Sequence, residues 1–404
     1  MAERVFITGV GMITAIGDNV TENLQQLLAQ QSGLGYTRYI DTIYKDVLPV
    51  GEVKHANESL FQLAGLPPQE GLTRTTLLGL IAMREALENA GISELNSVPA
   101  GFINASTVGG MCDTERVYFD IIDPGKEGSF LQYIDTLDCA DCTQRIADIV
   151  GFSDHIATIS TACSSSANAL MFGARMIKQG LYSRMVCGGT EALTRFTLNG
   201  FNSLKNVDKQ FCRPFDQQRT GLNLGEGAAY LVLESESFAK ANNSRILGEL
   251  SGYCNTNEAF HPTSPSPDGD GAFDAMRKAM EMSGIAREDV SYINVHGTAT
   301  LNNDISEGKA LERLFGTDVP PFSSTKPFTG HTLAAAGAIE AIYALLAIRE
   351  GLIYPNLNFS EKMEELQITP VTTLMQGVAI NHVISNSFGF GGNNASLVIS
   401  KYEG

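Results

Sequence analysis

The chain has 404 residues, 43% of them hydrophobic and 18% charged, a composition typical of a compact folded protein and not of a disordered one. Its formal net charge of -17 argues against general affinity for nucleic acid or for anionic membrane surfaces, because both require a basic footprint on the protein. The length is sufficient for two fused halves of ~150 to 200 residues each.

The sequence lacks the usual signals for export and membrane insertion. Met1-Ala2-Glu3-Arg4 leads directly into an apolar strand, without the basic segment and the long apolar segment of a signal peptide. No apolar run reaches the ~18 residues of a membrane span, since the longest one, 334–348, contains Glu340. The seven cysteines are scattered and odd in number, which favours a reducing compartment. We therefore expect a cytoplasmic protein.

The first part of the chain alternates between predicted strands and helices. In chain order, the sequence predicts a strand at 5–13, a helix at 20–31, an amphipathic helix at 72–90, a buried strand at 100–106, a short buried strand at 156–159, a small-residue helix at 167–178, and strands at 185–191 and 228–233. Cys139 and Cys142 form a lone C-x-x-C pair. Without a second ligand pair at zinc spacing, we predict structural thiols there and no metal site.

Cys163 lies between the predicted strand 156–159 and the helix 167–178, at a strand-to-helix turn. The free N–H groups and the dipole of a helix N-terminus favour a thiolate, and they can hold the oxyanion of an acyl group bound to the sulfur. An isolated cysteine among small residues is more often a packed core thiol. The reactive interpretation therefore depends on partners further along the chain.

A polar stretch at 234–243 is the predicted joint between two halves, 1–238 and 239–404. The second half is predicted to contain a strand at 246–252, an irregular loop at 261–271, a helix at 272–282, a strand leading to His296, an apolar helix at 332–348, a flexible glycine and aromatic loop at 386–394 and a final strand at 395–400. A faint repeat superimposes 165–181 on 336–352 with a constant offset of 171 residues, which predicts equivalent buried helices in two similar halves.

The second half holds polar residues that a plain core would not favour. His296 follows a buried strand and enters a glycine turn, while Lys326 and His331 precede the apolar helix. A single histidine at a strand end is more often structural. Two of only six histidines in such turns, together with Cys163, point instead to a shared site.

These segments resemble the motifs of β-ketoacyl-(acyl-carrier-protein) synthases of the elongating types I and II. The motifs are Thr161-Ala162-Cys163-Ser164-Ser165, Val295-His296-Gly297-Thr298-Ala299-Thr300, Thr325-Lys326-Pro327-Phe328-Thr329-Gly330-His331-Thr332 and Asn386-Ser387-Phe388-Gly389-Phe390-Gly391-Gly392. They occur in family order from the first strand to the last. The resemblance implies an α/β thiolase fold of duplicated halves in a five-layer αβαβα arrangement, and a homodimer.

The resemblance also implies the reaction. Cys163 would carry the acyl chain, and His296 and His331 would stabilise the enolate formed when malonyl-carrier protein loses CO2. The backbone N–H groups of Cys163 and Phe390 would hold the oxygen of the acyl group. Lys326 would pair with Glu340, because a carboxylate buried alone on an apolar helix would be costly. We expect no cofactor and no metal, since the substrates are carried on the phosphopantetheine of the acyl carrier protein.

Further residues match positions of the family. Asp304 and Glu307 would support the histidine strand, and Thr298 and Thr300 would bind the phosphopantetheine arm. Phe390 would act as a mobile gate, Val108 would limit the depth of the acyl pocket, and Phe201 and Phe388 are further candidates for substrate binding. Thr298 and Thr300 could also be plain strand residues, and Asp304 a helix cap.

Docking of the acidic carrier protein requires a local basic patch on so acidic an enzyme. Five basic residues fall within a short stretch of sequence, and they are the candidates for that patch against an ordinary solvated surface: Arg195, Lys205, Lys209, Arg213 and Arg219.

Some segments depart from the family pattern. Residues 137–150 do not resemble the usual segment near the dimer interface and acyl pocket, and Asn223, Glu226 and Phe215 are also unusual. The chemistry is unaffected, but chain-length preference and pathway stay open between fatty acid elongation and a specialised polyene or aryl polyene pathway with a chain-length-factor partner. An acyltransferase without decarboxylation, or a scaffold subunit, are the competing classes; the latter is disfavoured by the presence of Cys163.

Overall fold

The computed structural model describes residues 3–95 and 98–404, so Met1 and Ala2 of the N-terminal prediction lie outside the described residues. Its main feature is one mixed sheet to which both halves of the chain contribute. Across the sheet the strands are β3 (Ile156–Ile159), β2 (Ala100–Ala105), β4 (Arg184–Glu191), β5 (Gly227–Ser235), β1 (Val5–Thr14), β6 (Gly248–Asn257), β12 (Asn393–Ser400), β11 (His382–Gly389), β7 (Tyr292–Asn294) and β8 (Phe322–Ser323).

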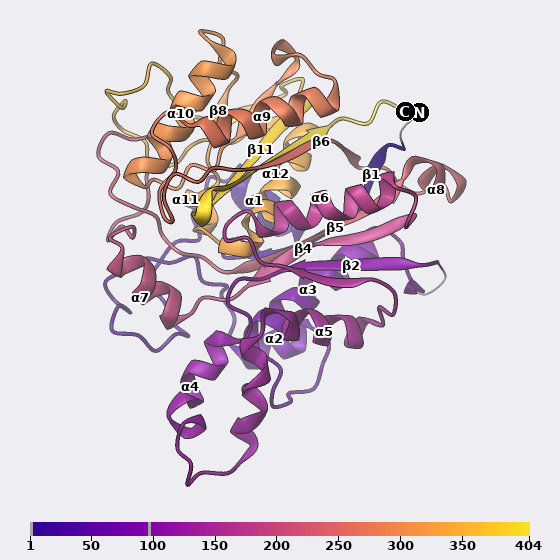
Figure 1. Ribbon diagram of the computed structural model, residues 1–404, viewed down its shortest axis with the longest axis vertical. Coiled ribbons are helices and arrows are strands. Elements are labelled where there is room, and N and C mark those ends of the chain that lie inside the picture. Colours follow the sequence, from indigo (N-terminus) through magenta and orange to yellow (C-terminus); the bar gives the residue numbers. More distant parts are fainter. Residues whose placement is uncertain (1–2, 96–97) are drawn as a thin grey trace.

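The sheet bends into two stacked parts, with helices between them and on both outer sides (Figure 1). On the outer side of the first part pack α2 (Asn57–Leu63), α3 (Arg74–Asn89) and α5 (Cys139–Val150), and on the outer side of the second part pack α9 (Asp270–Ser283) and α10 (Leu301–Phe315). The order is helix, sheet, helix, sheet, helix. The expected five-layer α/β arrangement of the thiolase fold is confirmed.

The central layer consists mainly of α6 (Ser165–Lys178) and α12 (Ala336–Glu350), which pack against each other. Their first residues are 171 positions apart, as the faint repeat predicted. A Cβ added at Gly337 would lie 2.8 Å from the Ala167 backbone nitrogen, so the small residues allow the two helices to approach closely. Because α12 is buried from residue 336 to residue 348, its sequence is apolar on all sides.

The two parts of the sheet meet where β1 pairs with β6 over two residue pairs, Phe6 with Glu249 and Ile7 with Gly248. The chain passes from β5 to β6 through the short helix α8 (Glu236–Ala241). The expected division at 238/239 falls inside α8, and it stays a prediction.

Two predictions about strands need correction. The segment 156–159 was expected to be buried, but β3 is an edge strand and each of its residues is partly exposed. The segment 386–394 was expected to be a loop, but its first four residues belong to β11 and only Phe390–Gly392 form the connection to β12. The glycine-rich sequence predicted a loop, but Gly389 pairs in register with Asn393 and therefore continues the strand.

Other parts of the fold lie around this frame. Helix α1 (Val20–Leu28) packs on β1, and α7 (Arg195–Ser203) follows β4. Helix α4 (Met111–Ile121) and the 3-10 helix η2 (Ser129–Tyr133) form a projection at one end of the molecule (Figure 1). The remaining elements are η3 (Asp135–Leu137), η4 (Arg287–Asp289), α11 (Lys326–Thr329), η5 (Leu333–Ala335), η6 (Phe390–Gly392), β9 (Leu352–Ile353) and β10 (Met375–Gln376).

All seven cysteines carry free thiols, and Cys142 donates a hydrogen bond from Sγ to the Cys139 carbonyl 3.2 Å away within the first turn of α5. Within the described part of the chain, no helix is both long enough and apolar enough to cross a lipid bilayer.

Candidate active site

Cys163 lies in the turn that joins β3 to α6. Ala162, the residue before it, has φ of 51°, a left-handed conformation that a residue with a side chain rarely adopts. The Ser165 hydroxyl stabilises this turn, since it accepts from the Thr161 N–H at 2.8 Å and donates to the Ala162 carbonyl at 2.6 Å. The turn places Cys163 directly before Ser164, the N-cap residue of α6, as expected for a strand-to-helix turn, and leaves it 5% exposed.

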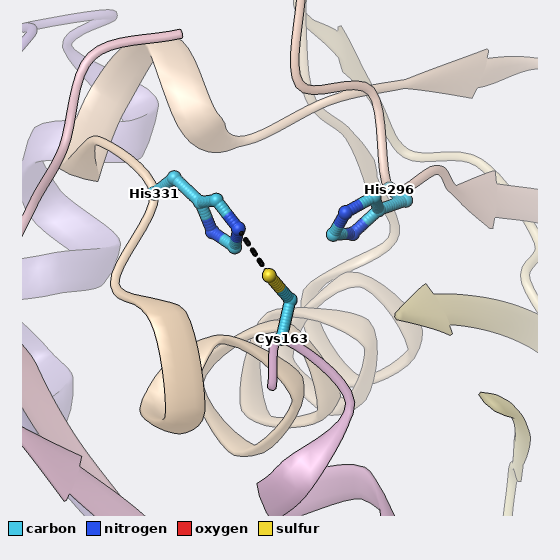
Figure 2. A group of neighbouring side chains, drawn as sticks. All are labelled: Cys163, His296 and His331. Atoms are coloured by element: carbon cyan, nitrogen blue, oxygen red, sulfur yellow. Dashed lines mark hydrogen bonds between the residues drawn. The ribbon is translucent and has the colours of Figure 1, made fainter. Parts of the chain in front are cut away.

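Two histidines from the second half of the chain reach this cysteine. His331 follows Gly330, whose φ of 73° turns the chain between α11 and η5, and His296 follows β7. The Nε2 atom of His331 is 2.9 Å from the Cys163 Sγ. The two imidazole rings are nearly perpendicular, with centroids 5.4 Å apart. Figure 2 shows that both rings and the sulfur point toward one common space.

A cavity of about 260 Å³ opens over the three side chains. Its wall includes three aromatic side chains and two hydroxyl side chains: Phe201, Phe388, Phe390, Thr298 and Thr300. The rings of Phe201 and Phe390 stack at 5.5 Å, and the hydroxyls of Thr298 and Thr300 are 2.9 Å apart. The structure thus brings all of these predicted residues to one cavity.

Burial dominates the ionisation of Cys163. It raises the pKa of the thiol to about 12, although Lys326 and the backbone N–H groups of Phe390 and Cys163 act in the opposite direction. The N–H groups at the helix terminus therefore favour the thiolate, as expected, but burial outweighs them and keeps the pKa of the thiol high. The same two N–H groups nevertheless face the sulfur, where they can hold an oxyanion.

Both imidazoles are neutral in the resting structure. Burial lowers the pKa of His296 and of His331 well below the usual range, and the positive charge of Lys326 lowers both further. The Nδ1 atom of each ring is buried without a hydrogen-bond partner among the described residues. With its proton on Nε2, neither ring leaves a buried N–H without an acceptor at Nδ1. Each ring can then donate one hydrogen bond from Nε2.

Two carboxylates hold the loop that carries His296. Glu307, on α10, accepts from the backbone N–H groups of His296 at 2.8 Å and Gly297 at 2.9 Å. Burial raises the pKa of Glu307 to about 7, and these hydrogen bonds oppose that rise. Asp304, one turn earlier, accepts from the N–H groups of Phe215 at 2.7 Å and Ala299 at 3.2 Å. Glu307 and Asp304 are therefore placed so that they can support the loop that carries His296.

Lys326 and Glu340 form the expected ion pair. The Nζ atom of Lys326 is 2.5 Å from Glu340 Oε1, and both side chains are almost fully buried. Burial raises the pKa of Glu340, and the charge of Lys326 opposes this rise. The positive charge of Lys326 lowers the pKa of Cys163 and of both histidines.

The structure does not bring every predicted residue to the site. Val108 is buried in the segment that follows β2, its N–H donates to Glu191, and it does not line the cavity of Cys163. Lys205 lies at the cavity and is exposed, and Lys209 is exposed close to it in sequence. Arg213 is partly buried and hydrogen-bonds Gln210.

Two of the basic residues need correction as members of a surface patch. Arg219 is only 4% exposed, because its guanidinium donates to the carbonyls of Asp216, Thr300 and Leu301. Arg195 pairs with Glu115 and lines a different cavity. A charged residue in a loop had been expected to be solvated, but backbone carbonyls satisfy it in the interior.

Sequence reasoning missed a group of three asparagines behind the nucleophile: Asn168 on α6, Asn255 on β6 and Asn393 on β12. Their amides are hydrogen-bonded to one another and to Ser164, next to Cys163. The one available signal was Asn168, an amide in a helix of otherwise small and apolar residues beside the Cys163 motif.

The three atoms at the centre of the site could also ligate a metal ion. One ligand atom each from Cys163, His296 and His331 lie within 4.8 Å of one another, and they are the only such group of three or more His, Cys, Asp or Glu residues in the described ranges. Sulfur and imidazole nitrogen are the ligand types of zinc. The expectation of no metal stays a prediction.

Comparison with protein families finds two models that match this chain. The β-ketoacyl synthase N-terminal domain matches residues 2–239, and the β-ketoacyl synthase C-terminal domain matches residues 247–360.

Curated relatives match over nearly the full length. The 3-oxoacyl-[acyl-carrier-protein] synthase 2 of Staphylococcus aureus (strain COL) is 33% identical over 411 residues, covering 99% of both chains, and that of Synechocystis sp. is 33% identical over 412 residues with the same coverage. Among solved structures, the ishigamide ketosynthase/chain length factor superimposes with a TM-score of 0.92 at 28% identity, covering 100% of both chains. The ketosynthase ApeO in complex with its chain length factor ApeC from Xenorhabdus doucetiae gives 0.86 at 29%, covering 99% of this chain and 98% of that one.

Proposed function

The chain belongs to the β-ketoacyl synthase family, and we propose that it is an acyltransferase that condenses an acyl group on Cys163 with malonyl-(acyl carrier protein) to give 3-oxoacyl-carrier protein and CO2, in fatty acid elongation. One observation carries this proposal: the Cys163 Sγ and the His331 Nε2 are 2.9 Å apart on a cavity that His296 also lines. Nucleophile and enolate-stabilising donors therefore share one reaction space.

The first step is acyl transfer. The Cys163 sulfur attacks the carbonyl carbon of an acyl thioester, the new C–S bond forms, and the bond to the carrier sulfur breaks. The proton of the thiol passes to the departing sulfur, so the step needs no other proton source. During the attack, negative charge on the acyl oxygen is stabilised by the backbone N–H groups of Cys163 and Phe390, which already face the sulfur.

The second step is decarboxylation of the malonyl thioester. The C–C bond to the carboxylate breaks, CO2 leaves, and the electron pair moves toward the thioester oxygen as an enolate. The Nε2–H groups of His296 and His331 are suited to stabilise that oxygen because both rings are neutral donors. The enolate carbon then attacks the acyl carbonyl on Cys163. The Cys163 thiolate that leaves takes up one proton from solvent, because burial raises its pKa, and this proton balances the negative charge of the malonyl carboxylate lost as CO2.

The walls of the cavity provide the binding functions. Thr298 and Thr300 offer hydroxyls to the phosphopantetheine arm, and Phe390 stacks on Phe201 where a gate between acyl and malonyl positions would have to move. Val108 does not line this cavity, and its role in limiting the depth of an acyl pocket stays a prediction. We propose no bound cofactor, because the steps need only groups of the protein, its substrates and one proton from solvent.

The partners follow from the same reaction. We propose that an acyl carrier protein docks at the mouth of the cavity beside Lys205, with Lys209 and Arg213 as further contacts, and that the chain forms a homodimer. A location in the cytoplasm is supported by the seven free thiols.

A second candidate is a specialised ketosynthase of a polyene, aryl polyene or other polyketide-like pathway, paired with a related chain-length subunit. The similarity to the ishigamide ketosynthase/chain length factor and to ApeO in complex with ApeC favours this candidate. The profile of product lengths and unsaturation with the cognate carrier protein would separate the two pathways. Co-expression with a candidate chain-length subunit would show whether the chain is a homodimer or half of a heterodimer.

The decisive experiment follows the acyl group and the CO2. Intact-protein mass spectrometry should detect an acyl group on Cys163, and CO2 should be released from malonyl-carrier protein. The variant Cys163→Ala should lose condensation, while Cys163→Gln should imitate the acylated state and keep decarboxylating. Acylation without any CO2 release would instead support a plain acyltransferase, and full condensation by Cys163→Ala would refute the proposal.

A further inference from the structure

The two N–H groups that would hold the acyl oxygen come from segments that are far apart in sequence. Cys163 belongs to the turn before α6, and Phe390 belongs to the connection between β11 and β12. Both N–H groups face the Cys163 sulfur. They can bind one oxygen only while these two segments keep a fixed relative position, because an oxyanion hole loses much of its effect when a donor moves by a fraction of an ångström.

Close backbone packing fixes one side of Phe390. Gly389 lies against the nucleophile turn, and a Cβ added there would be 2.9 Å from the Thr161 carbonyl oxygen and 3.3 Å from the Cys163 nitrogen. This contact brings the two segments together. It provides no directional bond that would hold them in register.

Hydrogen bonds fix the other side, through a single oxygen. Asn393 Oδ1 accepts from the Ser164 hydroxyl at 2.6 Å, from Asn168 Nδ2 at 2.9 Å and from Asn255 Nδ2 at 2.6 Å. Ser164 is the neighbour of Cys163 and the N-cap residue of α6. Asn393 is itself held in place, since its backbone pairs with Gly389 on one side and with Asn257 on the other.

The donors of this group are also fixed. Asn168 Nδ2 donates to the Thr161 hydroxyl at 2.8 Å, and Asn255 Nδ2 donates to Asn168 Oδ1 at 3.0 Å. The three asparagines therefore join α6, β6 and β12 behind the nucleophile turn, which contains the left-handed residue Ala162. A strained turn keeps its shape only when its surroundings determine it.

From these contacts we infer that Asn393 is a positioning residue: its side-chain oxygen holds the Cys163 turn against the Phe390 connection and so sets the distance between the two N–H donors of the oxyanion hole. The inference rests on the proposed function, because it concerns the acyl group on Cys163. It adds a residue that touches neither substrate nor sulfur.

The test compares two reactions of the same sulfur. Acyl transfer from octanoyl- or butyryl-carrier protein develops an oxyanion, whereas alkylation by iodoacetamide occurs at a saturated carbon and develops none. Both single-turnover rates are measured by intact-protein mass spectrometry for Asn393→Leu, which removes the acceptor, and Asn393→Asp, which keeps it. Asn381→Ala is the matched control, because Asn381 is exposed and directly precedes β11, at the end of the strand away from Gly389.

We expect Asn393→Leu to lower the ratio of acylation to alkylation by about tenfold or more, and Asn393→Asp to restore the ratio to within about threefold of the wild type. Equal losses in both reactions would show that Asn393 only maintains the fold around the sulfur, and wild-type rates in both reactions would show that it positions nothing; either result overturns the inference. If the wild-type protein itself forms no acyl-enzyme with either donor while iodoacetamide reacts, the proposed function has failed, and the variants are not responsible.

Discussion

The Nε2 atom of His331 lies 2.9 Å from the Cys163 sulfur, although 168 residues separate them along the chain. His296 shares the cavity but makes no hydrogen bond to this sulfur among the described contacts. The two imidazoles are therefore not equivalent. Both rings line the cavity, but only His331 lies within hydrogen-bonding distance of the sulfur.

This difference predicts different defects for the two histidine variants. His296→Ala should lower decarboxylation of malonyl-carrier protein by about 10²–10³-fold, equal to ~3–4 kcal/mol of barrier, because one of two enolate donors is lost. Acylation of Cys163 should change by no more than a few fold. His331→Ala should lower both rates. The check is the rate of CO2 release beside the rate of acyl-enzyme formation; identical losses in the two variants would contradict the assignment.

The pH dependence of Cys163 should be that of a buried neutral thiol. Because burial raises its pKa to about 12, the thiolate fraction should increase about tenfold per pH unit between about pH 7 and about pH 9. The rate of alkylation by iodoacetamide, followed by intact mass in the absence of substrate, should increase with the same slope. A plateau at neutral pH would show instead that the resting sulfur is already ionised.

The buried pair of Lys326 and Glu340 predicts a change in stability that depends on which partner is removed. Lys326→Met leaves Glu340 unpaired inside the protein and should lower the free energy of unfolding by about 3–5 kcal/mol. The double variant Lys326→Met/Glu340→Leu should recover most of this loss. Denaturant unfolding of the three proteins provides the measurement.

Activity of that double variant separates two roles of Lys326. If the lysine only holds the site together, activity should return with stability. If its charge is needed to keep both histidines neutral, the rate of decarboxylation should stay low in a protein that folds well.

Zinc should inhibit this enzyme. The ligand atoms of Cys163, His296 and His331 lie within 4.8 Å of one another and match the ligand types of zinc, so added Zn²⁺ should compete with the acyl donor for the sulfur. His331→Ala should weaken that inhibition, measured as the acylation rate against free Zn²⁺. A chelator should not lower the activity of the purified enzyme, and a loss on chelation would show that a metal is required.

Docking of the carrier protein should depend on Lys205 more than on other basic residues. Lys205→Glu should raise the KM for acyl-carrier protein by about three- to tenfold while kcat with a free pantetheine thioester stays unchanged, because the residue lies at the cavity mouth. The effect should decrease at high ionic strength. Lys240→Glu, on α8, is a matched control on another surface. Equal effects of both variants would indicate that only net charge matters.

Much of the site was readable from the sequence because its residues lie in short motifs. Cys163 stands before a small-residue helix, and His296 and His331 stand in glycine turns, so their local structure follows from local signals. Periodicity also predicted α3 and α12 to within a few residues. The repeat at an offset of 171 residues indicated that α6 and α12 are equivalent before their packing was known.

The errors arose where distant contacts decide the outcome. Gly389 reads as loop, but pairing with β12 makes it strand. Arg219 reads as surface, but three carbonyls and Asp304 surround it. The helix terminus at Cys163 indicated a thiolate, yet the depth of burial, which no local pattern contains, outweighs it. Asn393 was not singled out because its three donors lie on elements that only the fold brings together.

The link of β1 to β6 and the contact of α6 with α12 unite two halves that each hold only part of the chemistry. Cys163 comes from one half and both imidazoles come from the other. A substitution that loosens the contacts between the two halves, here called the seam, would therefore abolish turnover although Cys163 and both imidazoles remain present. Inactive variants far from the cavity should be mapped onto the seam before they are attributed to misfolding.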